Sequence, residues 1–126
     1  MGYQTSFKRA HGHGSAHEGT HHFWMQRITS VALVPLGLAF LWPFAAALGQ
    51  EPAAVRAIYQ NGWNAFIAIN FLLIGFWHLK QGNQVVIEDY VHTKGRRLRL
   101  LIANIFLCWS MAAASVMAVV SIWLGT

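Results

Sequence analysis

The sequence predicts an all-α integral membrane protein with three transmembrane helices in a single domain, residues 1–126. The first observation is composition: 56% of the residues are hydrophobic and 10% are charged, an apolar share above the roughly 45–50% that is usual for soluble domains. The second is length, because the uncharged runs approach or exceed the about 20 residues that a helix needs to cross a bilayer core. A soluble chain of this size could not bury so much apolar surface.

The three predicted spans are about residues 28–48, 63–85 and 100–124. The middle uncharged run, 63–79, is short and reaches spanning length if the helix continues past Gly82. Helices are favoured over strands because the runs are rich in Ala and Leu and lack the alternation of a barrel strand. Pro35 and Pro43 predict kinks in the first helix, since neighbouring helices can satisfy the freed carbonyl groups.

The basic residues predict the orientation of the chain. Eight of the nine lie in the N-terminal tail or the second connection, namely Lys8, Arg9, Arg27, Lys80, Lys94, Arg96, Arg97 and Arg99. Three spans place these two segments on one side, and the positive-inside rule makes that side cytoplasmic and the C-terminus periplasmic. The N-terminal segment makes a poor mitochondrial presequence, so the bacterial inner (plasma) membrane is favoured over the mitochondrial inner membrane.

The net charge of +5 follows from this topology. A basic run such as "KGRRLR" beside a span is typical of contact with anionic headgroups of the lipid bilayer, so no nucleic acid is expected as a partner. We interpret residues 1–22, with the stretch "HGHGSAHEGTHH", as a flexible cytoplasmic tail rich in His and Gly. Metal capture is the alternative, although no ordered helix would fix the ligand geometry there.

Three residues inside the spans have ordinary structural explanations. Asn70 and Asn104 carry amide groups that are expected to hydrogen-bond between helices. Cys108 is the single cysteine of the chain, so it can form neither an internal disulfide nor a CxxC site, and we expect a small buried residue.

His78 has a stronger functional interpretation. An ionisable side chain inside a transmembrane helix suggests a functional site, and imidazole can bind a metal as well as donate a hydrogen bond. Gly75 and Gly82 lie on the same helical face and would leave a surface for a flat macrocycle. A haem here would take histidine on both sides of its iron, and the second would have to come from a partner. The alternative is a hydrogen bond to a neighbouring helix.

Arg27 and the pair Asp89-Tyr90 each allow two interpretations. Arg27 either reaches lipid headgroups or pairs with a haem propionate. Tyr90 is either an interfacial aromatic residue or, beside an acid, a hydrogen-bond donor to a quinone carbonyl. The residues alone leave both questions open.

The chain resembles the small hydrophobic membrane-anchor subunit of succinate dehydrogenase, respiratory complex II, of the alphaproteobacterial type. The resemblance rests on His78, Gly82, Asp89 and Tyr90 around "QVVIEDYVH", and on His21, Phe23 and Arg27 preceded by "GSAHEGT". It covers essentially the whole chain, including the three-helix layout and the basic second connection. Lys80 departs from the pattern, and we expect it to snorkel or to pair with Glu88.

The resemblance implies a role for each matched position. His78 would ligate the iron of a haem b shared with a sister membrane-anchor subunit, Arg27 would lie near its propionates, and Gly82 would pack against it. Tyr90 would hydrogen-bond the ubiquinone headgroup, with Asp89 as its acidic neighbour.

The implied function is that of a membrane anchor in succinate:ubiquinone oxidoreductase, which serves the tricarboxylic acid cycle and electron transport. FAD and iron–sulfur clusters would belong to the flavoprotein and iron–sulfur subunits, because this chain has neither a dinucleotide-binding fingerprint nor a cysteine cluster. The alternatives are the anchor of a quinol:fumarate reductase, a structural membrane subunit without haem, and a small transporter, although no internal repeat favours the last.

Overall fold

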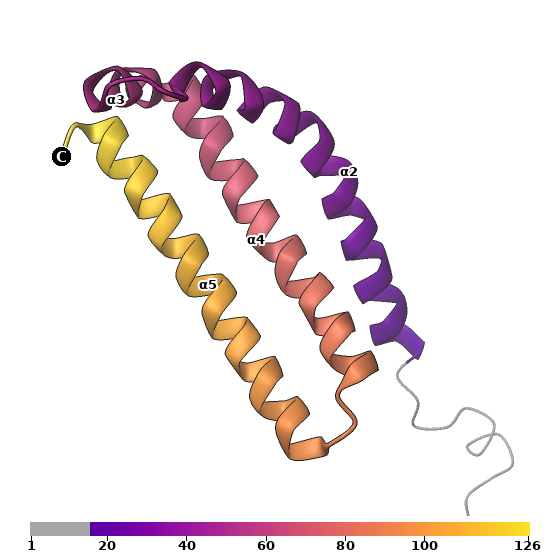
Figure 1. Cartoon of the computed structure of the whole chain (residues 1–126). Coiled ribbons are helices and arrows are strands. Elements are labelled where there is room, and N and C mark those ends of the chain that lie inside the picture. The colour runs from indigo at the N-terminus through magenta and orange to yellow at the C-terminus, as the bar shows by residue number, and fades with distance from the viewer. Residues whose placement is uncertain (1–15) are drawn as a thin grey trace, which may run out of the picture.

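The computed structural model describes the backbone of residues 16–126 and the side chains from residue 19 onward. These residues form four helices, namely α2 (Ala16–Ala47), α3 (Pro52–Gln60), α4 (Gly62–Tyr90) and α5 (Lys94–Leu124). The long helices α2, α4 and α5 run alternately up and down, and the short α3 lies across one end (Figure 1). Three of the helices are long and apolar enough to cross a membrane. The predicted fold class, all-α with three transmembrane helices, is thus confirmed.

The start of α2, the end of α4 and the start of α5 extend beyond the predicted spans, whereas the other ends agree to within one residue. Residues 16–22, which we expected in a flexible tail, are helical, and residues 1–15 lie outside the described part of the chain. Likewise α4 continues to Tyr90 and α5 begins at Lys94. The predicted bounds marked the loss of apolar character, whereas a helix can continue into the headgroup layer, where polar residues are tolerated.

Helix α3, which occupies the first connection, was not predicted from the sequence. Pro52 stands in its first turn, where a missing backbone N–H has no cost. Val55, Ile58 and Tyr59 share its half-buried face, and Asn64 of α4 donates from Nδ2 to the Ile58 carbonyl at 2.9 Å. Partial burial raises the pKa of the Tyr59 phenol above its ordinary value of 10.0. The spacing of the three apolar residues was the available signal.

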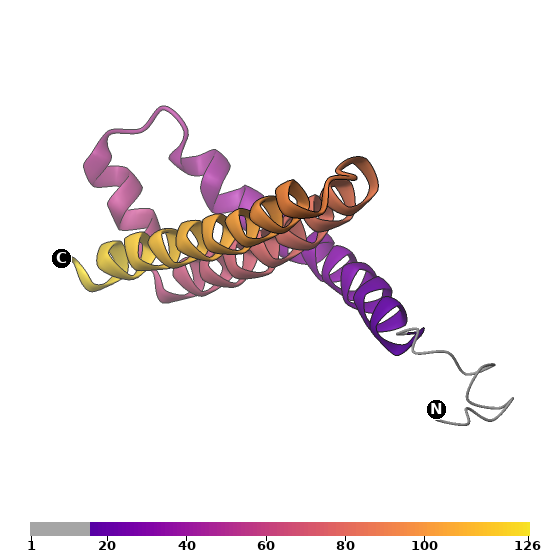
Figure 2. The ribbon, with the colours of Figure 1, turned by 90° about the horizontal axis from the view of Figure 1, so that it is seen from below.

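The first helix is continuous through both of its prolines, Pro35 and Pro43. Figure 1 shows α2 curving toward α3 at its C-terminal end, and Figure 2 shows its N-terminal part splaying away from α4 and α5. Near the upper end, Phe40 stacks on Phe71 of α4 with ring centroids 4.6 Å apart. In the N-terminal half of α2, the side chains of Gln26 and Thr29 hydrogen-bond α4.

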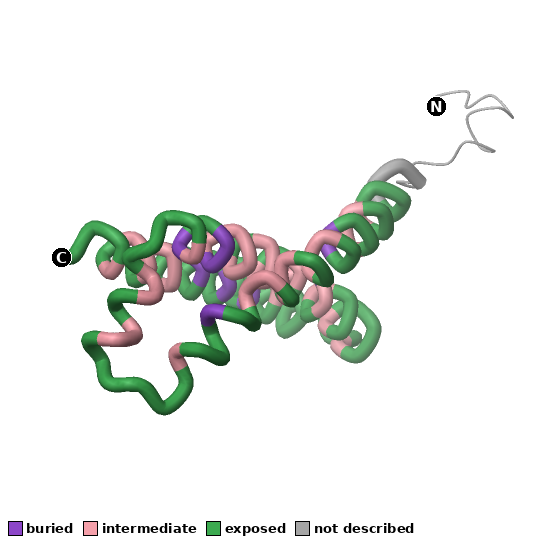
Figure 3. The backbone as a smooth tube through the Cα atoms, turned by 90° about the horizontal axis from the view of Figure 1, so that it is seen from above, coloured by how far each residue is buried: buried purple, intermediate pink, exposed green. Residues whose placement is uncertain are grey.

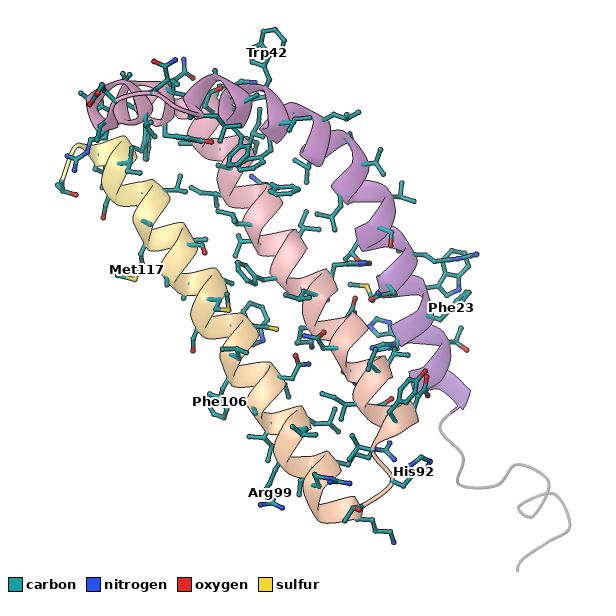
Figure 4. All side chains as sticks on the ribbon, viewed as in Figure 1. Phe23, Trp42, His92, Arg99, Phe106 and Met117 are labelled. Carbon is teal, nitrogen blue, oxygen red and sulfur yellow. The ribbon has the colours of Figure 1, made fainter. Side chains whose placement is uncertain are left out.

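Little of the chain is buried within itself. Between 11% and 17% of the apolar window of each span is buried, and the buried positions are confined to short segments (Figure 3). Trp42, Phe106 and Met117 point away from the other helices (Figure 4). The buried apolar core consists of Ala65, Ile67, Ala68, Cys108 and Ala112. Small residues of this kind let membrane helices approach closely, and the outward apolar surface suits lipid or other membrane subunits. The chain is a multi-pass membrane protein.

A polar contact joins α4 to α5. Asn104 donates from Nδ2 to the Lys80 carbonyl at 2.9 Å and accepts from Asn83 Nδ2 at 3.1 Å. Buried Cys108 lies one turn further, with Sγ 3.4 Å from Asn104 Oδ1. The expected interhelical role of Asn104 and the buried position of Cys108 are confirmed. Asn70 differs, because its Nδ2 donates to the Phe66 carbonyl of its own helix at 2.8 Å.

This difference gives a test of helix packing. We expect Asn104→Leu to destabilise the assembled protein by roughly 1 kcal/mol, the order measured for hydrogen bonds between membrane helices. Asn70→Leu is the matched control, since in the described structure it removes only a bond within one helix. Thermal unfolding of the detergent-solubilised complex measures both. An equal shift of the two midpoints would contradict a special role for Asn104.

Candidate functional site

His78 lies on α4, facing α2. Its Nδ1 lies 2.9 Å from Thr29 Oγ1, and its Nε2 lies 3.5 Å from Gln26 Nε2. Gln26 and Thr29 are three residues apart and therefore share one face of α2; Leu33 continues this face and lies against Gly75. His78 is thus within hydrogen-bond distance of a neighbouring helix, which is the arrangement expected if it serves helix packing. The bond on Nδ1 is short, whereas the contact at Nε2 is at the limit of a hydrogen bond.

The glycine face of α4 lies beside α2. A Cβ atom added at Gly82 would lie 3.8 Å from Gln26 Nε2, and one at Gly75 would lie 4.0 Å from Leu33 Cδ2. We expected these glycines to leave an open surface for a macrocycle. In the structure of this chain, one side chain of α2 lies beside each glycine, and both glycines remain half-buried.

Arg27 follows Gln26 but points to another side of α2. Its guanidinium carbon lies 4.9 Å from the centroid of the Phe23 ring. With Trp24, Ile28, Ser30 and Val31 it lines an open hollow of about 600 Å³. The structure records no hydrogen bond or ion pair between Arg27 and His78 in the described residues.

Asp89 and Tyr90 are the last two residues of α4, and both are exposed on this chain. Because α4 runs without interruption from His78 to Tyr90, a rise of about 1.5 Å per residue separates them by roughly 18 Å along the axis. They therefore form a second location rather than part of the His78 site. Asp89 stands at the negative end of the helix dipole, where a carboxylate is unfavourable by about 0.3–1 kcal/mol.

Lys80 and Glu88 line one polar hollow, and in the described structure they do not form the ion pair that was one of the two arrangements expected for Lys80. Lys80 Nζ lies 5.9 Å from the centroid of the Trp77 ring, and Glu88 accepts from Gln84 Nε2 at 2.9 Å. The hollow measures about 820 Å³ and lies between the N-terminal part of α2, α4 and the start of α5. Its lining is Gly19, His21, His22, Met25, Trp77, Lys80, Gln81, Gln84, Glu88 and Arg97.

Several polar side chains at these sites were not predicted from the sequence. Thr29 and Gln81 are buried, and His22 Nε2, Gln26 Oε1 and Gln81 Oε1 are buried atoms without a hydrogen-bond partner within the described residues. The only signal in the sequence was that these residues are polar and lie in or beside an apolar run, where polar groups need hydrogen-bond partners. Nothing in one sequence fixed the register of α2 against α4.

Among the side chains of residues 19–126, no three from His, Cys, Asp or Glu gather to hold a metal ion. The side chains of the earlier tail histidines, His11, His13 and His17, lie outside the described part of the chain.

Comparisons with known proteins place the chain in a family. A family profile described as "Succinate dehydrogenase/Fumarate reductase transmembrane subunit" matches residues 1–122. The succinate dehydrogenase hydrophobic membrane anchor subunit of Paracoccus denitrificans is 34% identical over 125 residues, which cover 99% of this chain and 96% of the relative. The corresponding subunit of Rickettsia bellii is 33% identical over 107 residues, which cover 80% and 81% of the two chains. No solved structure matches the chain significantly. The chain belongs to the family of succinate dehydrogenase/fumarate reductase transmembrane subunits.

Proposed function

We propose that the chain is the membrane-anchor subunit of a succinate:ubiquinone oxidoreductase. In this role it holds the flavoprotein and iron–sulfur subunits at the membrane, provides one axial ligand to a b-type haem, and forms part of a ubiquinone-reduction site. The observation that carries the proposal is the match to the Paracoccus denitrificans anchor subunit over 99% of this chain. Three spans with little internal burial support it further, because the outward surfaces suit other membrane subunits.

The haem assignment rests on His78. Its Nδ1 is held by Thr29, and its Nε2 faces a single long contact from Gln26, so a nitrogen remains for iron. The donor set of this chain fits one axial position, and the sister membrane-anchor subunit would supply the other. When bound, a haem with two histidine ligands supplies one-electron transfer. Arg27, which now lines a hollow on another side of α2, would have to turn toward its propionates. Contact with Gly82 would require the Gln26 side chain to turn aside.

The quinone assignment rests on Tyr90 and Asp89. The Tyr90 side chain is 79% exposed on this chain, so its phenol is available to donate a hydrogen bond to a quinone carbonyl. The unfavourable position of Asp89 in the last turn of α4 suggests that it is kept for function rather than for helix stability. The remaining walls of the pocket would come from the sister membrane-anchor subunit and the iron–sulfur subunit.

In the orientation that we propose, this quinone site lies on the cytoplasmic side. Lys94, Arg96, Arg97 and Arg99 lie in the first turns of α5, where the helix dipole disfavours cations. Their location is instead explained by the positive-inside rule, which puts the α4–α5 connection in the cytoplasm and the C-terminus in the periplasm. The relatives in Paracoccus denitrificans and Rickettsia bellii support a bacterial inner membrane.

A quinol:fumarate reductase anchor is the second candidate, because the matching family profile covers both enzymes. The relatives described above are succinate dehydrogenase subunits, which favours the first proposal. The two enzymes run related chemistry in opposite directions, and the preferred direction of the purified complex distinguishes them.

Deletion of the gene for this chain tests the anchoring role. We expect succinate oxidation measured with an artificial soluble acceptor to move from the membrane to the soluble fraction, and succinate:ubiquinone reduction to fall to background. Re-expression of the wild-type chain should restore both. Membrane-bound, ubiquinone-reducing activity in the deletion strain would contradict the proposal.

A further inference from the structure

The Thr29 side chain offers an inference that rests on the proposed haem role of His78 and extends it. We propose that Thr29 is a positioning residue for this ligand: its hydroxyl oxygen accepts a hydrogen bond from Nδ1–H of His78. The bond fixes the ring so that the proton is on Nδ1 and the lone pair is on Nε2, the nitrogen that would bind iron.

The direction of the bond follows from the other partners of Thr29. Its Oγ1 lies 2.8 Å from the Met25 carbonyl oxygen and 3.1 Å from that of Gln26. Carbonyl oxygens only accept, and a hydroxyl has a single proton. The proton must therefore point to the α2 backbone, since otherwise two oxygen atoms would face each other at 2.8 Å with no proton between them. The hydroxyl oxygen is left as an acceptor, and His78 Nδ1 must be the donor at 2.9 Å.

Burial makes this arrangement persistent. Thr29 is 8% exposed, the only side chain of α2 that is both polar and buried among the described residues. In an apolar span, breaking the bond would leave the buried Thr29 oxygen and the half-buried Nδ1–H of His78 without this partner, at a cost in free energy. Ligating histidines commonly donate their other N–H in this way, which orients the ring and increases the electron donation of the ligating nitrogen.

The other ring nitrogen of His78, Nε2, has only one weak polar contact. Gln26 Nε2 can donate toward the Nε2 lone pair of His78, which agrees with the proton being on Nδ1, but the distance is 3.5 Å. Gln26 Oε1 is buried without a hydrogen-bond partner within residues 19–126. The amide therefore gains little from its position and can turn aside when Nε2 binds iron. Thr29 holds the ring firmly while Gln26 releases the ligating atom.

Thr29→Val in the intact complex tests the role, because valine keeps the shape and lacks the hydroxyl. We expect haem retention to weaken on the order of 10-fold or more, as for other partners of ligating histidines. The remaining haem should have a more positive midpoint potential, since a less electron-donating imidazole stabilises ferric iron less. Haem per flavin and the redox potential are measured on the assembled fraction. Thr29→Ser should behave as wild type.

Ser30→Ala is the matched control, because its hydroxyl is adjacent in sequence but donates only to the Gln26 carbonyl at 2.8 Å. If Thr29→Val assembles poorly, Thr29→Ala provides a second variant without the hydroxyl. Wild-type haem content and potential in assembled Thr29→Val or Thr29→Ala, or a Thr29→Ser variant that resembles valine, would overturn the proposal. A wild-type complex without b-type haem would instead overturn the haem role of His78 itself.

Discussion

Replacing His78 by alanine is expected to abolish the low-spin b-type haem signal of the assembled complex. Among the described histidines, His78 is the one that lies within α4. One of its ring nitrogens has no short hydrogen bond and is available to bind iron. A haem iron that loses one of its two histidine ligands no longer has the ligand set that gives the low-spin spectrum. The reduced-minus-oxidised difference spectrum, normalised to flavin, measures the loss.

The structural role of His78 must be separated from ligation, because alanine also removes its bond to Thr29. His78→Asn is the useful second variant, since its amide nitrogen can still donate toward Thr29 but does not replace imidazole as a haem ligand. His92→Ala is the control for histidine loss in general, because His92 is exposed beyond the end of α4 (Figure 4). An unchanged spectrum in His78→Ala would mean that this side chain serves only to join α4 to α2.

The three spans could be predicted because a bilayer imposes a strong and simple constraint on composition. Long uncharged runs are needed to cross it, and few soluble folds tolerate them. The helix ends were predicted less well. The extra turns of α2, α4 and α5 are polar or charged, so the end of the apolar run does not mark the end of the helix. Helix α3 was not predicted for a related reason, because its amphipathic face becomes meaningful only once the ends of the other helices are in place.

The candidate site was predictable only in part. His78 stands out in the sequence, because an ionisable group in a span has a high energetic cost. Thr29 and Gln26 do not stand out, since their importance depends on the register of α2 against α4, which is decided by packing between distant segments. The role of the surface beside Gly82 stays a prediction for the same reason, because a glycine face admits a neighbouring helix as readily as a cofactor.

Tyr90→Phe is expected to lower succinate:ubiquinone reduction on the order of 10²-fold, the lower end for a positioned proton donor. Succinate oxidation with an artificial soluble acceptor should not change. The side chain is 79% exposed and ends α4, so removal of its hydroxyl leaves the packing of this chain intact. A selective loss would therefore report contact with the quinone rather than a damaged fold. Both activities are measured on the same preparation, relative to flavin.

Tyr59→Phe is the matched control, because this phenol lies on α3 at the opposite end of the spans. It should leave ubiquinone reduction unchanged. Asp89→Asn separates the charge from the phenol: it keeps the size of the side chain and removes the carboxylate from the negative end of the α4 dipole. A helix-stabilising change that nevertheless slows quinone reduction would identify Asp89 as functional. Equal loss of both activities in Tyr90→Phe would indicate failed assembly, and loss of neither would make Tyr90 an interfacial aromatic residue.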